Sequence, residues 1–496
     1  MPQSHPIAAI DLGSNSFHLV VAEPRPGHLK VLDRLREVTR LGAGLDAEGI
    51  LTANAMETAL GCLQRFGERV RHLPAGAVRA VGTNALRRAR NADIFLRRAE
   101  RLLGHPIDIV SGIEEARLIY VGVSHGLAEV AGQRLVMDIG GGSTELILGR
   151  RHEPRIMESL HMGCVSMTAQ FFSDGGIDTK RLRAAELAAG QEFEPIEEQF
   201  RREGWQSAIG SSGTLLAVAD ALALHKFSAE GITRAGLQRL RAALLDFGHV
   251  DQLARFGIRE DRCAVFPGGF AVVMAAFEEL GIEQMQVSTS ALREGVLYDL
   301  VGRIEHEDIR DHTVEALAQR FHVDAAQTAR VMATADALYM FAAEAWNLTD
   351  PAYRQLLRWA ARLHEIGSSV SHSQYQKHGA YLLQYLDMPG FSRGEQRRLG
   401  FLVRAHRRKF PQAELVQLPE PEREPCRRLS VLLRLAVVLH RARRAQALPA
   451  MSVTVDGANL RLVLPKLWLD DHALVAADLE QEAGFLKAAG LKLRVR

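Results

Sequence analysis

Two short stretches of the chain share one pattern of apolar and small residues. Residues 11–22 are DLGSNSFHLVVA and residues 138–149 are DIGGGSTELILG, so Asp, Gly, Ser and Leu recur at the same places without a gap. In each copy an apolar run ends at the Asp, small residues follow, and a second apolar run begins. This pattern predicts two β-hairpins with Gly/Ser-rich tips. The repeat also predicts two related lobes that face each other across a cleft.

The segment between the two hairpins predicts two further strands, each followed by a helix. Residues 77–81 (AVRAV) are apolar, and the GTNALRRARN that follows predicts a turn into a helix with Thr83 or Asn84 as its N-cap. Residues 107–110 (IDIV) are also apolar, and Ser111 and Gly112 then separate this strand from a predicted helix.

Later parts of the chain change character. Residues 208–214 (AIGSSGT) predict a third small-residue turn after an apolar strand. From about residue 305 the pattern is mainly helical, and residues 358–366 (RWAARLHEI) predict an amphipathic helix. Residues 451–465 alternate around an Asp-Gly pair, which predicts a final hairpin in a small β-containing tail.

Composition limits the class of protein. A chain of 496 residues is too long for one core, so three or four domains are expected. The formal net charge of +2 gives no general reason for nucleic-acid binding. The four cysteines form no CxxC pair, which predicts buried, reduced thiols in a cytoplasmic protein. Neither a signal peptide nor an apolar run of the roughly 20 residues that span a membrane is expected.

The hairpin tips carry the first chemical hypothesis. Small residues let backbone N–H groups approach an anion closely. An Asp beside the same tip repels phosphate unless a divalent cation lies between them. These tips lack GxxxxGK[ST], and no GxGxxG follows the first strand, which argues against a P-loop and against a dinucleotide-binding enzyme.

Three other features have two interpretations each. Arg87, Arg88 and Arg90 form either a solvated basic face or an anion clamp beside the first hairpin. Glu114 and Glu115 either interact favourably with the start of a helix or place a general base at a phosphate cleft. The third turn either approaches another phosphate or closes the second lobe.

The motifs DLGSNSFHLV, SGIEEARLIY, DIGGGSTEL, MGCVS, GSSGT and ALREGVLYD occur in this order along the chain. In this combination the sequence resembles the exopolyphosphatase/guanosine pentaphosphatase family over essentially its whole length, and it is most similar to the long bacterial exopolyphosphatases. The implied fold is α/β, with two ribonuclease-H-like lobes of the sugar kinase, heat-shock chaperone and actin superfamily. A mainly helical HD-like domain and a small α/β tail follow. We expect the domains to span residues 1–124, 125–304, 305–445 and 446–496.

The resemblance implies a role for each matching residue. Glu115 matches the catalytic base, while Asp138 and Glu145 match acids that hold the metal and the attacking water. Asp11 would help to bind the metal, and Arg87 matches an Arg that contacts phosphate. The remaining implied phosphate-binding residues lie on the three turns and after the 77–81 strand: Ser14, Asn15, Ser16, Thr83, Gly140, Gly141, Gly142, Ser143, Gly210, Ser211, Ser212 and Gly213.

The activity implied is processive removal of terminal phosphates from inorganic polyphosphate by metal-assisted, in-line attack of water. The alternatives are guanosine pentaphosphate (pppGpp) hydrolysis, a non-hydrolytic polyphosphate or nucleotide sensor, and a sugar kinase, for which AIGSSGT is a poor adenosine loop. The resemblance further implies Mg²⁺, activation by K⁺, a homodimer and no nucleic-acid partner. Some relatives associate peripherally with the inner face of the membrane.

The helical domain resembles HD-type phosphohydrolases in His364, Glu365, His378 and His406. Glu365 stands where HD proteins carry Asp, and Val437 lies near the expected closing Asp, so we expect a scaffold without its own metal site. The basic runs RAHRRK (404–409) and HRARR (440–444) form either solvated faces or a groove for the distal part of a polyanion. If they form a groove, removal of residues 305–496 would weaken binding of long chains more than attack on short ones.

Overall fold

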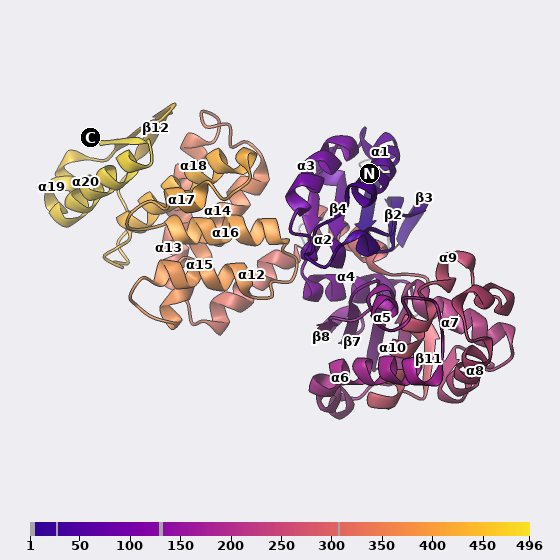
Figure 1. The fold of residues 1–496 in the computed structure, drawn as a ribbon. Coiled ribbons are helices and arrows are strands. Elements are labelled where there is room, and N and C mark those ends of the chain that lie inside the picture. The colour runs from indigo at the N-terminus through magenta and orange to yellow at the C-terminus, as the bar shows by residue number, and fades with distance from the viewer. Residues whose placement is uncertain (1–4, 26–27, 128–131, 306–307) are drawn as a thin grey trace. The chain divides into compact units, whose positions relative to one another are not determined.

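The structure is a computed structural model that describes residues 5–25, 28–127, 132–305 and 308–496 (Figure 1). The chain divides into two compact units, one ending at Asp308 and the other beginning at Ile309. The first unit contains two α/β lobes, and the second contains the helical domain and the small sheet. No helix of the described chain is long and apolar enough to cross a membrane.

The first lobe is built on a five-stranded sheet in the order β3-β2-β1-β4-β5. Antiparallel pairing joins β1 to β2 and β2 to β3, whereas β4 and β5 extend the sheet in parallel. The strands are β1 (Ile7–Leu12), β2 (Ser16–Arg25), β3 (His28–Val38), β4 (Val78–Gly82) and β5 (Ile107–Ile109). The helices before the second lobe are η1 (Leu41–Gly44), α1 (Ala53–Val70), η2 (Ala75–Ala77), α2 (Asn84–Arg88), α3 (Ala92–Leu103) and α4 (Gly112–His125).

The second lobe repeats this plan in a six-stranded sheet of order β10-β11-β9-β6-β7-β8. Its strands are β6 (Gln133–Ile139), β7 (Thr144–Arg150), β8 (Glu153–Leu160), β9 (Ser207–Ser211), β10 (Ile232–Thr233) and β11 (Gln284–Val287). Its helices are α5 (Cys164–Phe171), α6 (Thr179–Glu203), α7 (Ser212–Leu224), α8 (Arg234–Phe247), η3 (Val250–Phe256), α9 (Glu260–Cys263) and α10 (Phe266–Glu279). Read from its other edge, the second sheet has the order β8-β7-β6-β9-β11, which corresponds strand for strand to β3-β2-β1-β4-β5 of the first lobe. This shared order confirms the predicted pair of ribonuclease-H-like lobes.

The two predicted hairpins match residue for residue. Asp11 pairs with His18 across β1 and β2, and Asp138 pairs with Glu145 across β6 and β7. The register then shifts between Val21 and Ala22 in one lobe, and between the equivalent Leu148 and Gly149 in the other. A β-bulge bends a strand and re-aims its side chains. Its presence at the same place in both lobes shows that the sequence repeat is also a structural repeat.

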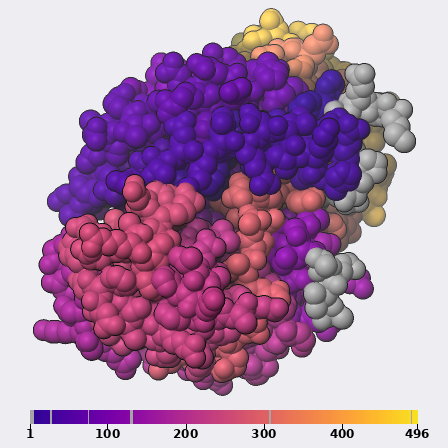
Figure 2. Space-filling view, turned by 90° about the vertical axis from the view of Figure 1, so that its right-hand side faces the viewer, coloured from indigo at the N-terminus to yellow at the C-terminus, as the bar shows by residue number. Residues whose placement is uncertain are grey.

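Helix α11 (Leu292–Ile304) returns the chain to the first lobe. Its apolar side chains Leu292, Val296, Leu297 and Leu300 are buried in the hydrophobic core of that lobe, and the helix packs along α4. Helix α4 also packs on β7 and β8 of the second lobe. The pair α4–α11 therefore lies at the seam between the lobes, which Figure 2 shows pressed together along one face.

A buried ionic network fixes the position of α4 against α11. Arg117 of α4 donates from Nε to Glu114 at 2.7 Å and also pairs with Asp299 of α11. Asp299 accepts hydrogen bonds from Arg79 of β4 and Arg303 of α11 as well. All five side chains are largely buried. The network joins β4, α4 and α11. It therefore fixes the position of the helix turn that carries Glu115.

The second unit combines a helical bundle with a three-stranded sheet of order β12-β13-β14. The bundle consists of α12 (Ile309–Arg320), α13 (Ala325–Ala342), α14 (Pro351–Leu363), η4 (Ile366–Ser369), α15 (Tyr375–Tyr385), α16 (Arg393–Ala405), α17 (Gln412–Leu415) and α18 (Glu420–Leu439). The tail consists of β12 (Ser452–Asp456), β13 (Asn459–Val463), α19 (Lys466–Asp471), α20 (Ala473–Ala488) and β14 (Lys492–Val495). One hydrophobic cluster runs through bundle and tail, and the fully buried Arg434 of α18 pairs with Glu482 of α20.

Three of the HD-like positions, His364, Glu365 and His406, lie in one polar cluster. The rings of His364 and His406 meet edge to face at 5.3 Å, and Glu365 pairs with Arg443. Arg443 also contacts Asp324 at 3.0 Å. Two arginines of the basic runs also form ion pairs, Arg404 with Glu414 and Arg441 with Asp478. A third, Arg407, lies over the ring of Tyr375.

All four cysteines are free thiols. Cys62, Cys164 and Cys426 are buried, as the sequence predicts, whereas Cys263 on α9 is partly exposed. Burial raises the pKa of the Cys62 thiol well above its usual value, so this side chain stays protonated and acts as a small apolar residue.

Candidate functional site

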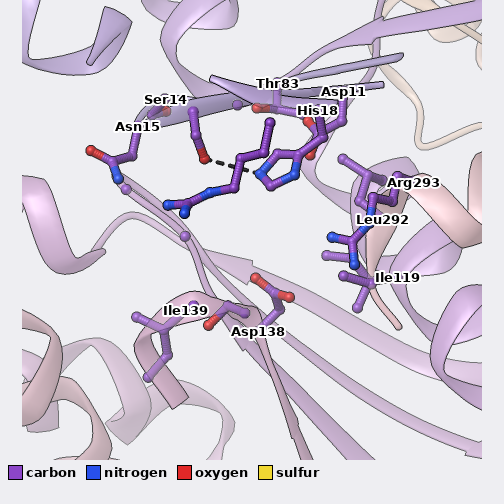
Figure 3. A pocket seen from close by; sticks show the side chains of 18 of the residues that line it. Asp11, Ser14, Asn15, His18, Thr83, Ile119, Asp138, Ile139, Leu292 and Arg293 are labelled. Atoms are coloured by element: carbon purple, nitrogen blue, oxygen red, sulfur yellow. Dashed lines mark hydrogen bonds between the residues drawn. The ribbon is translucent and has the colours of Figure 1, made fainter. Parts of the chain in front are cut away.

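A cavity of about 440 Å³ lies between the two hairpin tips and brings together most of the predicted site residues. Asp11 and His18 project from one wall, Asp138 from the facing wall, and Arg293 from the side (Figure 3). The predicted residues that line it are Asp11, Ser14, Asn15, Ser16, Thr83, Glu115, Asp138, Gly140, Gly141, Ser143, Ser212 and Gly213. The other predicted residues do not line this cavity; they are Arg87, Gly142, Glu145, Gly210 and Ser211.

The two hairpin tips touch each other. A Cβ on Gly141 would lie 2.8 Å from the Cβ of Ser14, which is closer than two carbon atoms can pack. Gly142 stands just behind the tip, where its carbonyl accepts a hydrogen bond from Asn84 at 3.3 Å. The MGCVS motif supports the second tip from below, because the backbone N–H of Cys164 donates to Gly140 at 2.9 Å. Small residues are therefore needed at the second tip to let both loops reach one cavity.

The third turn forms another part of the cavity wall. Ser212 has a left-handed backbone, with φ of 89°, and its hydroxyl is buried without a hydrogen-bond partner. Backbone strain of this kind in a non-glycine residue costs of the order of 1–3 kcal/mol and is common at ligand sites. Ser211, just before this turn, is fully buried, and its hydroxyl lies 3.2 Å from the carbonyl oxygen of Ser290.

Both hairpin aspartates bind a proton more tightly than an exposed aspartate does. Burial, together with the neighbouring charge of Glu115, raises the pKa of Asp11 to about 8. Burial also raises the pKa of Asp138 to about 6, although a hydrogen bond from Ser211 opposes this shift. One oxygen of Asp11 is buried with no hydrogen-bond partner. Two acids held in this way favour a cation between them, because a cation would offset both burial and mutual repulsion.

Glu115 extends from the first turn of α4 into the cavity. Ser111 caps this helix by accepting from the backbone N–H of Glu114 at 3.1 Å, and Glu114 itself belongs to the buried network with Arg117. The adjacent acids thus have different roles, since Glu114 is structural and Glu115 lines the cavity. Arg87 donates from Nη1 to Oε2 of Glu115 at 2.6 Å and to the carbonyl of Val110 at 3.1 Å.

Glu145 lies beneath the cavity and is fully buried. Its Oε1 accepts a hydrogen bond from Ser159 at 2.9 Å, while its Oε2 has no partner. Burial raises the pKa of Glu145 well above its usual value, and the nearby charges of Glu115 and Asp138 add to this effect. The carboxyl groups of Glu115, Asp138 and Glu145 are therefore close enough to repel one another.

Three arginines to which the sequence analysis assigned no role also line the cavity. They are Arg36 of β3, Arg262 of α9 and Arg293 of α11. Burial, together with the charges of these three arginines, lowers the pKa of His18 to about 3, so its imidazole is neutral. The imidazole Nε2 lies 3.0 Å from the Ser16 hydroxyl. Only Arg293 belongs to a quoted motif, ALREGVLYD, which is the one signal that could have identified it.

Arg262 is seated directly on the third turn. A Cβ on Gly213 would lie 1.9 Å from its Nη2, so the absence of a side chain at Gly213 makes room for the guanidinium. Within the described part of the chain, the guanidinium of Arg262 has neither a hydrogen bond nor an ion pair, and burial lowers its pKa. By contrast, Arg36 pairs with Asp261 of the second lobe at 3.0 Å. An unpaired, partly buried guanidinium is well suited to bind an anionic ligand.

The residues fit a divalent cation only in part. No cluster of three or more His, Cys, Asp or Glu side chains in the described ranges is arranged to hold a metal ion by itself. However, Asp11 and Asp138 share the cavity, and Asp11 has an oxygen without a partner. Mg²⁺ commonly uses one or two carboxylates, water and substrate phosphates rather than an all-protein cage. The donor set therefore fits Mg²⁺ bound together with a phosphate substrate.

Comparison with known proteins places the chain among phosphatases. A guanosine-5'-triphosphate,3'-diphosphate pyrophosphatase of Aeromonas hydrophila subsp. hydrophila is 40% identical over 475 residues, which cover 96% of this chain and 95% of that protein. A crystal structure of an exopolyphosphatase from Cytophaga hutchinsonii is 26% identical, with a TM-score of 0.55, and covers 60% of this chain and 98% of that one. The Ppx-GppA enzyme of Aquifex aeolicus is 25% identical, with a TM-score of 0.51, and covers 59% and 98%.

Two family models match consecutive parts of the chain. The model of the Ppx/GppA phosphatase family matches residues 20–304, and that of Ppx/GppA phosphatase domain III matches residues 309–483. These matches include both lobes with their shared cavity and most of the second unit. On this basis, and on the 40% identity of a relative over nearly its full length, the chain belongs to the Ppx/GppA phosphatase family of phosphohydrolases.

Proposed function

We propose that this protein hydrolyses the terminal phosphoanhydride bond of guanosine 5'-triphosphate 3'-diphosphate, pppGpp, and releases orthophosphate. The observation that carries the proposal is the 40% identity to the Aeromonas pyrophosphatase named for this nucleotide, over 96% of the chain. This similarity supports the nucleotide, which the sequence motifs suggested as an alternative, better than it supports polyphosphate, which they suggested first.

Carboxyl and guanidinium groups both line the cavity, and this combination suits such a substrate. The carboxyl groups of Asp11, Asp138 and Glu115 would face the phosphate that is removed. The guanidinium groups of Arg262 and Arg293 would face the phosphates that remain on the product. A nucleotide with phosphates at both its 5' and 3' positions has enough charge to contact both kinds of group.

Glu115 is the proposed general base. It lines the cavity, it extends from a helix fixed by the Glu114–Arg117 pair, and Arg87 holds its Oε2. From this position it would accept a proton from water as the water attacks the terminal phosphorus in line with the leaving oxygen. The bond between phosphorus and the bridging oxygen breaks, and the proton taken from water leaves with the products.

The small-residue turns would bind the terminal phosphate through their backbone N–H groups. Ser14, Asn15 and Ser16 supply one turn, and the 140–143 turn supplies the other. Asp11 and Asp138 would hold Mg²⁺, which supplies charge neutralisation of the phosphate oxygens when bound. The neutral His18 would orient the hydroxyl of Ser16 toward the same oxygens.

A second candidate substrate is inorganic polyphosphate. The Cytophaga structure, described as an exopolyphosphatase, is similar over 98% of its own length to the two-lobed unit of this chain. Removal of a terminal phosphate is the same reaction for both substrates, and every group named above would act identically. Activation by K⁺, a homodimer and peripheral association with a membrane stay predictions from the resemblance.

Release of orthophosphate from pppGpp, long polyphosphate and tripolyphosphate, each with Mg²⁺ and with a chelator, tests the proposal. We expect the highest kcat/KM for pppGpp and no turnover of any substrate with the chelator. A higher kcat/KM for long polyphosphate would replace the nucleotide with the second candidate. Binding of all three substrates without phosphate release would favour the sensor alternative.

A further inference from the structure

A second cavity, of about 510 Å³, lies on the first lobe where β3 ends and α1 begins. It is lined by the end of β3, by η1 and by the first turns of α1. The residues are Val38, Thr39, Arg40, Ala43, Gly44, Thr52, Asn54, Ala55 and Thr58. None of them lines the cavity between the hairpin tips, and none has been given a role so far.

The start of α1 supplies a positive electrostatic potential to this cavity. The helix has 18 residues, and Thr52 caps it by accepting from the backbone N–H of Ala55. Its first turn contains no acidic residue that would neutralise the helix dipole. The first N–H groups of such a helix have no partner within the helix and favour an anion.

Thr39 supplies an independent indication of a ligand. Its side chain is only 5% exposed and lines the cavity, yet its hydroxyl has no hydrogen-bond partner. A buried hydroxyl left unsatisfied costs of the order of 1–3 kcal/mol, so native proteins rarely retain one. A bound oxyanion would accept the hydrogen bond that this hydroxyl cannot make to the protein.

Arg40 supplies a positive charge with no competing acid. Its backbone is left-handed, with φ of 49°, a conformation that costs a non-glycine residue of the order of 1–2 kcal/mol. Its side chain is exposed and, in the part of the chain that the structure describes, takes part in no hydrogen bond or ion pair. An arginine without a competing acid, next to a helix N-terminus, can hold an oxyanion through charge-assisted hydrogen bonds.

The same segment holds the first hairpin tip. The backbone N–H groups of Thr39 and Arg40 donate to the carbonyl of Asn15 at 3.1 and 2.9 Å, and that of Gly42 donates to Ser14 at 2.7 Å. Ser14 and Asn15 in turn line the cavity between the lobes. One stretch of backbone therefore borders both cavities, with a different residue set facing each.

We propose that this second cavity binds a phosphate-type oxyanion through the Arg40 guanidinium, the Thr39 hydroxyl and the N-terminal N–H groups of α1. The anion is either free orthophosphate or a phosphate of a bound chain that lies away from the reacting end. The proposal goes beyond the proposed function, because it concerns binding at a site without catalytic groups and does not depend on which substrate is hydrolysed.

A ³¹P NMR titration of the full-length protein with orthophosphate tests the site without turnover. Wild type should bind phosphate at the central cavity and at the second cavity. Arg40→Gln removes a charged hydrogen bond, so the second class of binding should weaken about tenfold or more. Thr39→Val, which keeps the branched shape, should weaken it by a smaller factor.

Arg151→Gln is the matched control, because Arg151 is also an exposed arginine with a left-handed backbone, φ of 52°, but lies between β7 and β8. It should bind phosphate as wild type does. Identical titrations for Arg40→Gln, Thr39→Val and Arg151→Gln would overturn the proposal. Circular dichroism verifies that each variant is folded.

Competition binding then separates the two sources of the anion. If the site holds a distant phosphate of a chain, Arg40→Gln should weaken binding of long polyphosphate about tenfold and leave tripolyphosphate unchanged. If it holds free orthophosphate, both polyphosphates should bind equally well to variant and wild type, and only the orthophosphate titration should change. Either pattern supports the site and assigns its ligand.

Discussion

The Nη1 atom of Arg87 lies 2.6 Å from Oε2 of Glu115, so the proposed base is held by a charged hydrogen bond before any substrate is present. Both side chains are largely buried, with exposed fractions of 12% and 10%. The guanidinium contacts Oε2 and thereby fixes the position of the Glu115 carboxyl group at the cavity. This geometry connects two sequence features that separately had ambiguous interpretations.

Glu115→Gln should lose most turnover and retain substrate binding. The amide keeps the size of the side chain but cannot accept a proton, and general bases typically contribute 10²–10⁴-fold to a rate. Single-turnover phosphate release and equilibrium binding of pppGpp measure the two effects separately. The exposed Glu57→Gln is the matched control and should turn over normally. Near-normal turnover of Glu115→Gln would reject the assignment of the base.

Asp11→Asn should make the protein more stable at pH 8 while removing activity. In the folded protein the pKa of Asp11 is raised from 3.8 to about 8, so the native state binds the proton more tightly than the unfolded state. Stability is therefore unaffected below about pH 4, falls as pH rises from about 4 to 8, and stays lowered above that range. Asn carries no charge and avoids this loss.

Thermal unfolding between pH 5 and 9 in the presence of a chelator tests this expectation. The difference in Tm between Asp11→Asn and wild type should grow with pH and correspond to a few kcal/mol at pH 8. Added Mg²⁺ should raise the Tm of wild type more than that of the variant. A Tm difference that is constant over this pH range would contradict the stated cause.

Asp299→Asn should destabilise the first unit strongly. Asp299 is buried and interacts with Arg79, Arg117 and Arg303, which hold its pKa far below the usual range against the opposing effect of burial. Its neutralisation leaves three guanidinium groups with one compensating charge fewer, and breaking a buried pair typically costs about 3–5 kcal/mol. Urea unfolding followed by tryptophan fluorescence measures the change. Removal of the exposed Arg98–Glu57 pair should have no measurable effect.

Gly213→Ala should reproduce the kinetic defect of Arg262→Gln. The added methyl would meet the Arg262 guanidinium and displace it from the third turn. Both variants should raise KM at least several-fold, because each removes the Arg262 guanidinium from the cavity lining. Gly484→Ala in α20, where the added methyl meets nothing within 4 Å, is the control and should leave KM unchanged. Different KM values for Gly213→Ala and Arg262→Gln would show that Gly213 has another role.

The sequence predicted those parts of the site that lie within one continuous segment. Each hairpin brings its own Asp and its own small residues together, so their proximity depends only on local pairing, and both hairpins form as predicted. The alignment of residues 11–22 with residues 138–149 also matches His18 with Glu145, and the structure pairs each of them with the aspartate of its own hairpin.

The sequence did not predict the three arginines that line the cavity. Arg36, Arg262 and Arg293 come from a strand of the first lobe, a four-residue helix of the second, and a helix that returns to the first. Their convergence depends on how three distant segments pack, and no local periodicity encodes it. The packing of α11 in the core of the first lobe was not predicted for the same reason. The apolar pattern of a helix does not indicate which of two similar lobes it packs against.

The equivalent places of His18 and Glu145 in the two hairpins give the cleft a direction. Two identical lobes related by a twofold axis would offer the same charge from both sides, and a ligand with two anionic ends could then enter in either orientation with equal energy. A neutral imidazole on one side and a carboxyl group on the other remove this equivalence. The difference between His18 and Glu145 therefore makes the two sides of the cleft chemically unequal. Such a cleft can distinguish the leading end of a substrate from its trailing end.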